Sequence, residues 1–126
     1  VCPTCNNKYM SDTEYCLFFR EEGVSLYGDY ESKRTYYVTP INKRDKGKFL
    51  HPTIKPEQII RNLIINSSKE GDLILDPFMG SGTTAVASKN LNRHYLGFEI
   101  FEQYYKIAID RLNNIQAGGQ VSLFTE

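Results

Sequence analysis

The sequence predicts an α/β fold in which parallel strands are flanked by helices. Short apolar runs bounded by turn residues lie at 73–75 and 95–100. Apolar residues recur at helical spacing before, between and after these runs, and a glycine-rich turn joins the first run to the helix that follows it. Strands that alternate with helices in this way are typical of a parallel sheet covered by helices.

The first half of the chain contains one expected strand and one expected helix. Glu14–Arg20 (EYCLFFR) is a mostly apolar run with aromatics, which predicts a strand. Residues 21–55 are polar and rich in turn residues, so a long irregular connection is expected there. A helix is expected from Pro56, because proline suits the first helical position and Glu57 complements the helix dipole. Its apolar face consists of Ile59, Ile60, Leu63 and Ile64.

The second half contains two expected strands and two expected helices. Gly71-Asp72 turns the chain into the apolar run 73–75, which predicts a buried strand. Thr83–Leu91 follows the glycine turn and predicts a helix, and Tyr95–Ile100 predicts the next strand. The last helix is expected to carry its apolar side at Phe101, Tyr104, Tyr105, Ala108, Leu112 and Ile115.

Composition places the chain among globular domains. Its 126 residues suffice for one domain or a piece of one, and 40% of them are hydrophobic. No apolar run in the sequence approaches the roughly 18 residues that span a membrane. The three cysteines are an odd number, which argues against a secreted disulfide framework and favours the reducing cytoplasm. Cys2 and Cys5 have the spacing of half a zinc site, but a second closely spaced pair is missing, so no metal is expected.

The net charge of zero conceals an uneven distribution. Residues 33–48 contain six basic side chains against one acidic side chain, whereas residues 1–32 are acidic on balance. Tyr36 and Tyr37 lie within the basic stretch. Such a stretch is either a solvated loop or a surface that meets DNA phosphates, with aromatics available to stack. The DNA-contact candidates are Lys33, Arg34, Lys43, Arg44, Lys46 and Lys48.

The most informative segment is the turn after the strand that ends at Asp76. Gly80 and Gly82 let the backbone approach a ligand at the carboxyl edge of the sheet, where ligands bind. Glu99 ends the next strand 23 positions later, where an acidic residue typically takes ribose hydroxyls. Two carboxylates without a phosphate-binding Gly-Lys-Ser/Thr favour S-adenosylmethionine. A dinucleotide is the alternative, since Gly80, Gly82 and Ala85 match G-x-G-x-x-A, although other residues separate the strand from the first glycine.

Several strings in the chain resemble a known enzyme family. DPFMGSGTT (76–84) resembles the cofactor-binding motif of the DNA amino-methyltransferases that act on adenine N6 or cytosine N4. HPTIKP (51–56) resembles the motif that precedes it in the permuted beta group. YLGFEI (95–100) is similar to the family's strand with its ribose-binding acid, and EYCLFFR to the strand before its recognition region. The resemblance implies part of a Rossmann-like, S-adenosylmethionine-dependent methyltransferase fold from a bacterial or phage restriction-modification system.

The resemblance also implies a division of the chain and a set of site residues. Residues 1–116 would be the C-terminal part of a methyltransferase domain, and 117–126 a flexible tail. Within the first part, 21–55 would be a loop that contacts double-stranded DNA, and 51–116 the cofactor-binding core. The implied cofactor-binding residues are His51, Pro52, Thr53, Asp76, Pro77, Phe78, Gly80, Ser81, Gly82, Thr83, Thr84 and Glu99.

The family's catalytic tetrapeptide is not in this chain. It consists of Asp, Asn or Ser followed by Pro-Pro and an aromatic residue, whereas the five prolines here are never adjacent. In the permuted beta group that motif lies N-terminal to the segments found here, so the chain resembles the C-terminal part of such an enzyme. Its partner would be the missing N-terminal part of the same enzyme. The chain alone is expected to be inactive. The implied reaction is methyl transfer to adenine N6 of a flipped base in DNA, with cytosine N4 as an alternative. A dinucleotide-dependent oxidoreductase or a non-catalytic DNA- or cofactor-binding remnant are the other interpretations.

The tail contains a short peptide motif. Gln120, Leu123 and Phe124 follow the joint Ala117-Gly118-Gly119. They resemble the Gln-x-x-Leu-Phe peptide with which bacterial DNA enzymes bind the sliding clamp. The alternative is an apolar tail that packs on its own domain.

Overall fold

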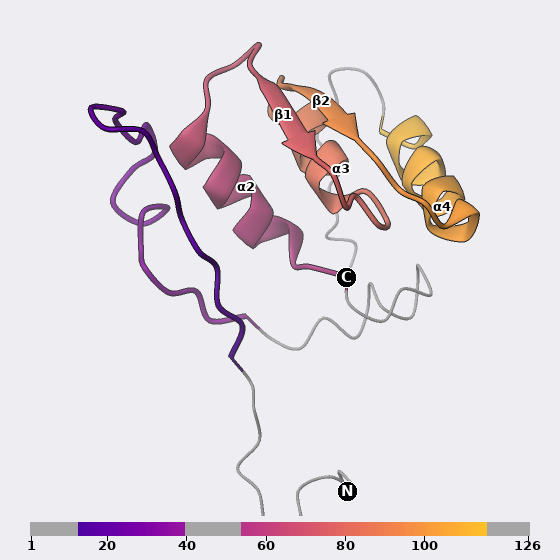
Figure 1. Cartoon of the computed structure of the whole chain (residues 1–126), viewed down its shortest axis with the longest axis horizontal. Coiled ribbons are helices and arrows are strands. Elements are labelled where there is room, and N and C mark those ends of the chain that lie inside the picture. Colours follow the sequence, from indigo (N-terminus) through magenta and orange to yellow (C-terminus); the bar gives the residue numbers. More distant parts are fainter. Residues whose placement is uncertain (1–12, 40–53, 116–126) are drawn as a thin grey trace, which may run out of the picture.

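The computed structural model describes residues 13–39 and 54–115, and Figure 1 shows its three helices and two strands. Helix α2 spans Glu57–Ser67 and is followed by strand β1 at Leu73–Asp76. Helix α3 spans Thr83–Asn90 and connects β1 to strand β2 at His94–Gly97. Helix α4 spans Glu102–Asn113. The expected alternation of helices and strands is confirmed from α2 onward.

The two strands form a parallel sheet with α3 as its crossover. Leu73 pairs with His94 and Asp76 pairs with Gly97, so both strands end at the same edge. Figure 1 shows α3 behind the strands, with α2 on one side of it and α4 on the other. Because α3 contacts both strands and both helices, it is the centre of the fold.

The core forms where α3 meets its neighbours. Ala85 and Ala87 have 1% and 0% of their surface exposed, and Ser88 has 0%. Such small side chains let α3 pack closely against the elements on every side of it. The hydrophobic cluster between the glycine turn, α3 and α4 consists of Met79, Ala85, Val86, Ala108, Leu112 and Ile115.

The prediction of a strand at Glu14–Arg20 is wrong for this structure. These residues carry no strand, and Tyr15, Leu17 and Phe19 are 79–92% exposed. A strand needs hydrogen bonds from a neighbouring strand, and within residues 13–39 and 54–115 the sheet consists of β1 and β2 alone. The following stretch, 21–39, is irregular as predicted.

The burial of the strands also differs from the prediction. Leu73 and Leu75 are 62% and 59% exposed, so β1 is covered on one face rather than buried on both. Alternation along each strand and the pairing of Leu75 with Leu96 place all three leucines on one face of the sheet. β2 begins one residue earlier and ends three residues earlier than expected, so Glu99 lies just beyond the strand and not at its last position.

Two kinds of feature are absent from the described part of the chain. None of its helices is both long and apolar enough to cross a membrane. In residues 13–39 and 54–115, no cluster of three or more His, Cys, Asp or Glu side chains has the arrangement of a metal site.

Candidate functional site

The candidate site is the turn that leaves β1 and enters α3. Gly80 and Gly82 both have positive φ, 54° and 80°, and the second occupies the N-cap position of α3. This left-handed backbone suits glycine, since a Cβ would be strained there. Asp76 closes the start of the turn by accepting the N–H of Phe78 at Oδ1, 3.1 Å away. The predicted order of strand, glycine turn and helix is thus confirmed.

Glu99 connects this turn to the start of α4. Its Oε2 accepts the N–H of Gly80, and its Oε1 accepts the N–H of Phe101, both at 2.8 Å. The Phe98 N–H, next to Glu99, donates to the Asp76 carbonyl at 3.1 Å, which holds the two strand ends together. The structure therefore brings Asp76 and Glu99 to one edge of the sheet, where each accepts a backbone N–H of the turn.

Residues Ser81 and Thr83 attach the turn to α4. Ser81 and Thr83 are 3% and 7% exposed, and their hydroxyls lie within 3.3 Å of Arg111 Nη1. These two hydroxyls thus face α4, while Thr84 is half-buried and its carbonyl accepts the Ser88 hydroxyl at 2.8 Å.

Two further residues shape the turn from outside its motif. A Cβ on Gly97 would overlap the side chain of Met79, so a larger residue at this position of β2 would require that side chain to move. Arg111, on α4, contacts the turn at Ser81 and Thr83. Neither Gly97 nor Arg111 was predicted from the sequence. The one available signal was Gly97 itself, because a glycine within a predicted strand can mark the close approach of another segment.

Of the other candidate cofactor residues, two are exposed on the turn and three lie outside the described residues. Phe78 is 88% exposed, so its ring extends into solvent, and Pro77 is exposed beside it. The candidates His51, Pro52 and Thr53 lie outside the described residues.

The loop before α2 is attached to that helix through Asn66. The Asn66 Nδ2 donates to the Ser32 carbonyl at 2.6 Å, and the Ser32 hydroxyl donates to Asn66 Oδ1 at 2.8 Å. The Asn66 carbonyl accepts the Tyr27 N–H at 2.9 Å. A Cβ on Gly28 would lie 1.9 Å from Asn66 Oδ1, so glycine is required for this contact. The Ser32 N–H donates to Asp29 Oδ1 at 2.7 Å, and this hydrogen bond lowers the pKa of the Asp29 carboxyl.

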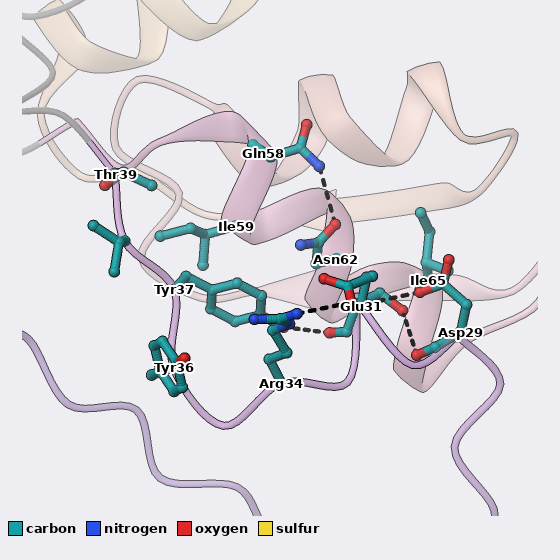
Figure 2. A pocket seen from close by; sticks show the side chains of 12 residues that line it. Asp29, Glu31, Arg34, Tyr36, Tyr37, Thr39, Gln58, Ile59, Asn62 and Ile65 are labelled. Atoms are coloured by element: carbon teal, nitrogen blue, oxygen red, sulfur yellow. Dashed lines mark hydrogen bonds and ion pairs between the residues drawn. The ribbon is translucent and has the colours of Figure 1, made fainter.

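An open recess of about 540 Å³ lies between this loop and α2. Figure 2 shows Arg34, Tyr36 and Tyr37 on the loop side and Gln58, Ile59 and Asn62 on the helix side. Arg34 forms an ion pair with Glu31 at 2.8 Å, and the Gln58 amide donates to Asn62 at 3.1 Å. Of the DNA-contact candidates, the structure describes Lys33 and Arg34, both exposed, whereas Lys43, Arg44, Lys46 and Lys48 lie outside the described residues.

The parallel β-α-β unit and its glycine turn, with a carboxylate beside each strand end, define a Rossmann-like α/β protein. The particular family follows from comparison with known proteins. The model of the N6/N4 DNA methylase family matches residues 4–110, and the chain belongs to this family.

The relatives in this family are longer than the chain. A type II methyltransferase, M2.LlaDCHI of Lactococcus lactis subsp. cremoris, is 39% identical over 97 residues, which are 76% of this chain and 36% of that protein. M2.DpnII of Streptococcus pneumoniae is 50% identical over 70 residues, which are 56% of this chain and 26% of that protein. The chain therefore spans about a third of the length of these relatives or less.

A solved structure supports the same fold. The crystal structure of a complex of M1.HpyAVI with SAM superimposes with a TM-score of 0.59 at 32% identity. The match covers 75% of this chain and 47% of that chain. The expected methyltransferase fold is confirmed.

Proposed function

We propose that the chain is the S-adenosylmethionine-binding part of a DNA methyltransferase that modifies adenine N6. The observation that carries this proposal is the pair of carboxylates, Asp76 and Glu99, which both accept backbone N–H groups of one glycine turn. The SAM complex of the structural relative M1.HpyAVI supports the choice of cofactor. Cytosine N4 is the alternative target, because the base is decided by a tetrapeptide that this chain does not contain.

The same geometry argues against a dinucleotide. In dinucleotide sites, the N–H groups of a glycine turn and the helix behind it receive a pyrophosphate. Here the Gly80 N–H is already donated to the Glu99 carboxylate. A pyrophosphate at this edge of the sheet would therefore lie near the carboxylates of Asp76 and Glu99. Its negative charges would be repelled by theirs.

The residues of the chain would bind and orient the cofactor. When bound, S-adenosylmethionine supplies a methyl group activated by its sulfonium. A carboxylate offers about four acceptor sites, so Glu99 retains lone pairs for ribose hydroxyls after it accepts Gly80 and Phe101. Asp76 and the glycine turn would surround the remainder of the cofactor, and the proposed partners of the methionine carboxylate are His51, Pro52 and Thr53, which lie outside the described residues.

The rest of the domain would cover the open face of the sheet. Leu73, Leu75 and Leu96 share that face at 47–62% exposure, and Phe98 and Ile100 follow them at 56% and 90%. We infer that an N-terminal part of the same protein packs on this face and supplies the catalytic tetrapeptide. The proposed location is the cytoplasm, where the thiols of the three cysteines stay reduced. In this assignment 1–116 belong to the methyltransferase domain, with 51–116 as its cofactor-binding core.

Calorimetry and a methylation assay test the proposed function. The full-length protein that contains this chain is expected to bind S-adenosylhomocysteine and not NAD. With labelled S-adenosylmethionine and duplex DNA, nucleoside digestion is expected to yield N6-methyladenine, whereas N4-methylcytosine would establish the alternative. The 126 residues alone are expected to transfer no methyl group. Binding of NAD in place of S-adenosylhomocysteine would refute the assignment.

The loop 21–55 would contact DNA through its basic side chains. Reversing the charge of Lys43, Arg44 and Lys46 in the full-length protein is expected to weaken DNA binding. The magnitude of the slope of log K against log salt should fall by about 0.9 for each phosphate that the protein no longer neutralises. Fluorescence anisotropy at several salt concentrations measures both effects, with Lys106→Glu on α4 as a control. An unchanged affinity and slope would refute the role of the loop.

The tail would bind the sliding clamp through Gln120, Leu123 and Phe124, which lie outside the described residues. A synthetic peptide of residues 117–126 is expected to bind clamp in the micromolar range, as short peptide motifs do. Replacing Leu123 and Phe124 with alanine should abolish this binding, and a wild-type peptide without affinity would contradict the proposal.

A further inference from the structure

The rear of the glycine turn is fixed by one side chain of α4. Arg111 lies in the last turn of that helix and donates from Nη1 to the Ser81 carbonyl at 2.6 Å. The same nitrogen lies 3.3 Å from the Ser81 hydroxyl and 3.2 Å from the Thr83 hydroxyl. A terminal guanidinium nitrogen carries two N–H groups, so the short bond to the carbonyl is the principal one and the two hydroxyls share the second donor.

The peptide unit that Arg111 contacts is held at both ends. Its carbonyl, on Ser81, accepts from Arg111, and its N–H, on Gly82, donates to the Met79 carbonyl at 2.9 Å. The next carbonyl, on Gly82, accepts the Val86 N–H at 2.9 Å, which is the first i→i−4 hydrogen bond of α3. A charged donor forms a shorter and stronger bond than a neutral donor. Arg111 therefore sets the orientation of the peptide plane between Ser81 and Gly82, where the turn ends and α3 begins.

Packing on the same helix reinforces this contact. A Cβ on Gly82 would lie 2.8 Å from the Ala108 Cβ, so α4 rests directly on the turn one helical turn before Arg111. Ala108 is 0% exposed, and Ser81 is 3% exposed. The turn is thus in contact with α4 at Ser81 and Gly82 and with the Glu99 carboxylate at Gly80.

We infer that Arg111 is a positioning residue for the cofactor turn. It holds Ser81, Gly82 and Thr83 in the conformation that receives the cofactor, without being one of the residues proposed to contact it. The inference rests on the proposed function and adds to it a residue outside the motif 76–84. Because its effect passes through the turn, loss of Arg111 should change cofactor affinity and leave the maximal rate nearly unchanged.

The test compares Arg111→Met, Arg111→Lys and Lys106→Met in the full-length protein. Arg111→Met is expected to raise KM for S-adenosylmethionine and Kd for S-adenosylhomocysteine roughly 10-fold, since a charged hydrogen bond to the turn is lost. The kcat at saturating cofactor and the affinity for DNA should stay within about twofold of the wild-type values. Arg111→Lys restores a charged donor and should recover part of the affinity. Lys106, on the same helix and paired with Glu102 at 2.7 Å, serves as the matched control and should change nothing.

The outcomes separate the inference from the proposed function. An unchanged KM for Arg111→Met, or a loss that appears in kcat at saturating cofactor, would overturn the positioning role alone. A wild-type protein that does not bind S-adenosylhomocysteine would overturn the proposed function and this inference with it. If Arg111→Met does not fold, Arg111→Lys decides, because its KM should still rise about threefold and an unchanged value would count against the inference.

Discussion

Replacing Glu99 with glutamine is expected to weaken the binding of S-adenosylhomocysteine to the full-length protein by about 10- to 100-fold. The two carboxylate oxygens accept the N–H groups of Gly80 and Phe101, both at 2.8 Å. Glutamine has one acceptor oxygen, so its amide NH₂ would face one of these backbone donors. The substitution therefore loses a hydrogen bond to the turn or to α4, together with the charged acceptor for ribose.

Calorimetry measures this effect, and Glu102→Gln is its control. Glu102 lies three positions away on α4, has a side chain 79% exposed and pairs with Lys106. The same chemical change there removes a surface ion pair of small value, so the affinity should stay at the wild-type level. Equal affinities for Glu99→Gln and Glu102→Gln in folded proteins would contradict the role assigned to Glu99.

Gly82→Ala is expected to destabilise the full-length protein by about 2–5 kcal/mol. An alanine at φ 80° occupies the left-handed region, which costs about 1–2 kcal/mol. Its Cβ would also lie 2.8 Å from the Ala108 Cβ and 3.2 Å from the Ala108 Cα, and overpacking of this kind costs about 1–3 kcal/mol. Thermal unfolding with and without S-adenosylhomocysteine measures the loss, and the stabilisation by ligand should shrink as well.

Gly71→Ala separates the two contributions to this loss. Gly71 has φ 83°, and its Cβ would meet no heavy atom within 4 Å. It should therefore lose only about 1–2 kcal/mol, the value for the backbone conformation. Adding Ala108→Gly to Gly82→Ala removes the clashing methyl group and should recover part of the difference. Equal losses for Gly71→Ala and Gly82→Ala would show that the contact with α4 has no effect.

The helices and the glycine turn could be predicted because their causes are local. Ile59, Ile60, Leu63 and Ile64 lie at helical spacing, and α2 begins one residue after the proline that was expected to start it. The turn from Asp76 to Gly82 is specified by glycines whose φ values are positive in the structure. Residues close together in sequence determine each of these elements, so a single sequence suffices to find them.

The errors and omissions concern residues whose partners are distant in sequence. The run Glu14–Arg20 has the composition of a strand, but a strand forms only beside another strand, and composition does not identify one. Arg111 lies 30 positions from Ser81, and nothing in the helical pattern of α4 distinguishes it from a solvated arginine. The prediction that Leu73 and Leu75 are buried failed because it assumed that both faces of the sheet are covered.

The uncovered face of the sheet has a consequence for how the cell would treat incomplete copies of the protein. Leu73, Leu75 and Leu96 form an apolar surface next to strands whose outer edges are unpaired within the described residues. Apolar patches and open strand edges are the features that chaperones and proteases recognise in unfinished proteins, and they also promote aggregation. A truncated product with this face open would therefore be more prone to aggregation and degradation than a product whose sheet is covered.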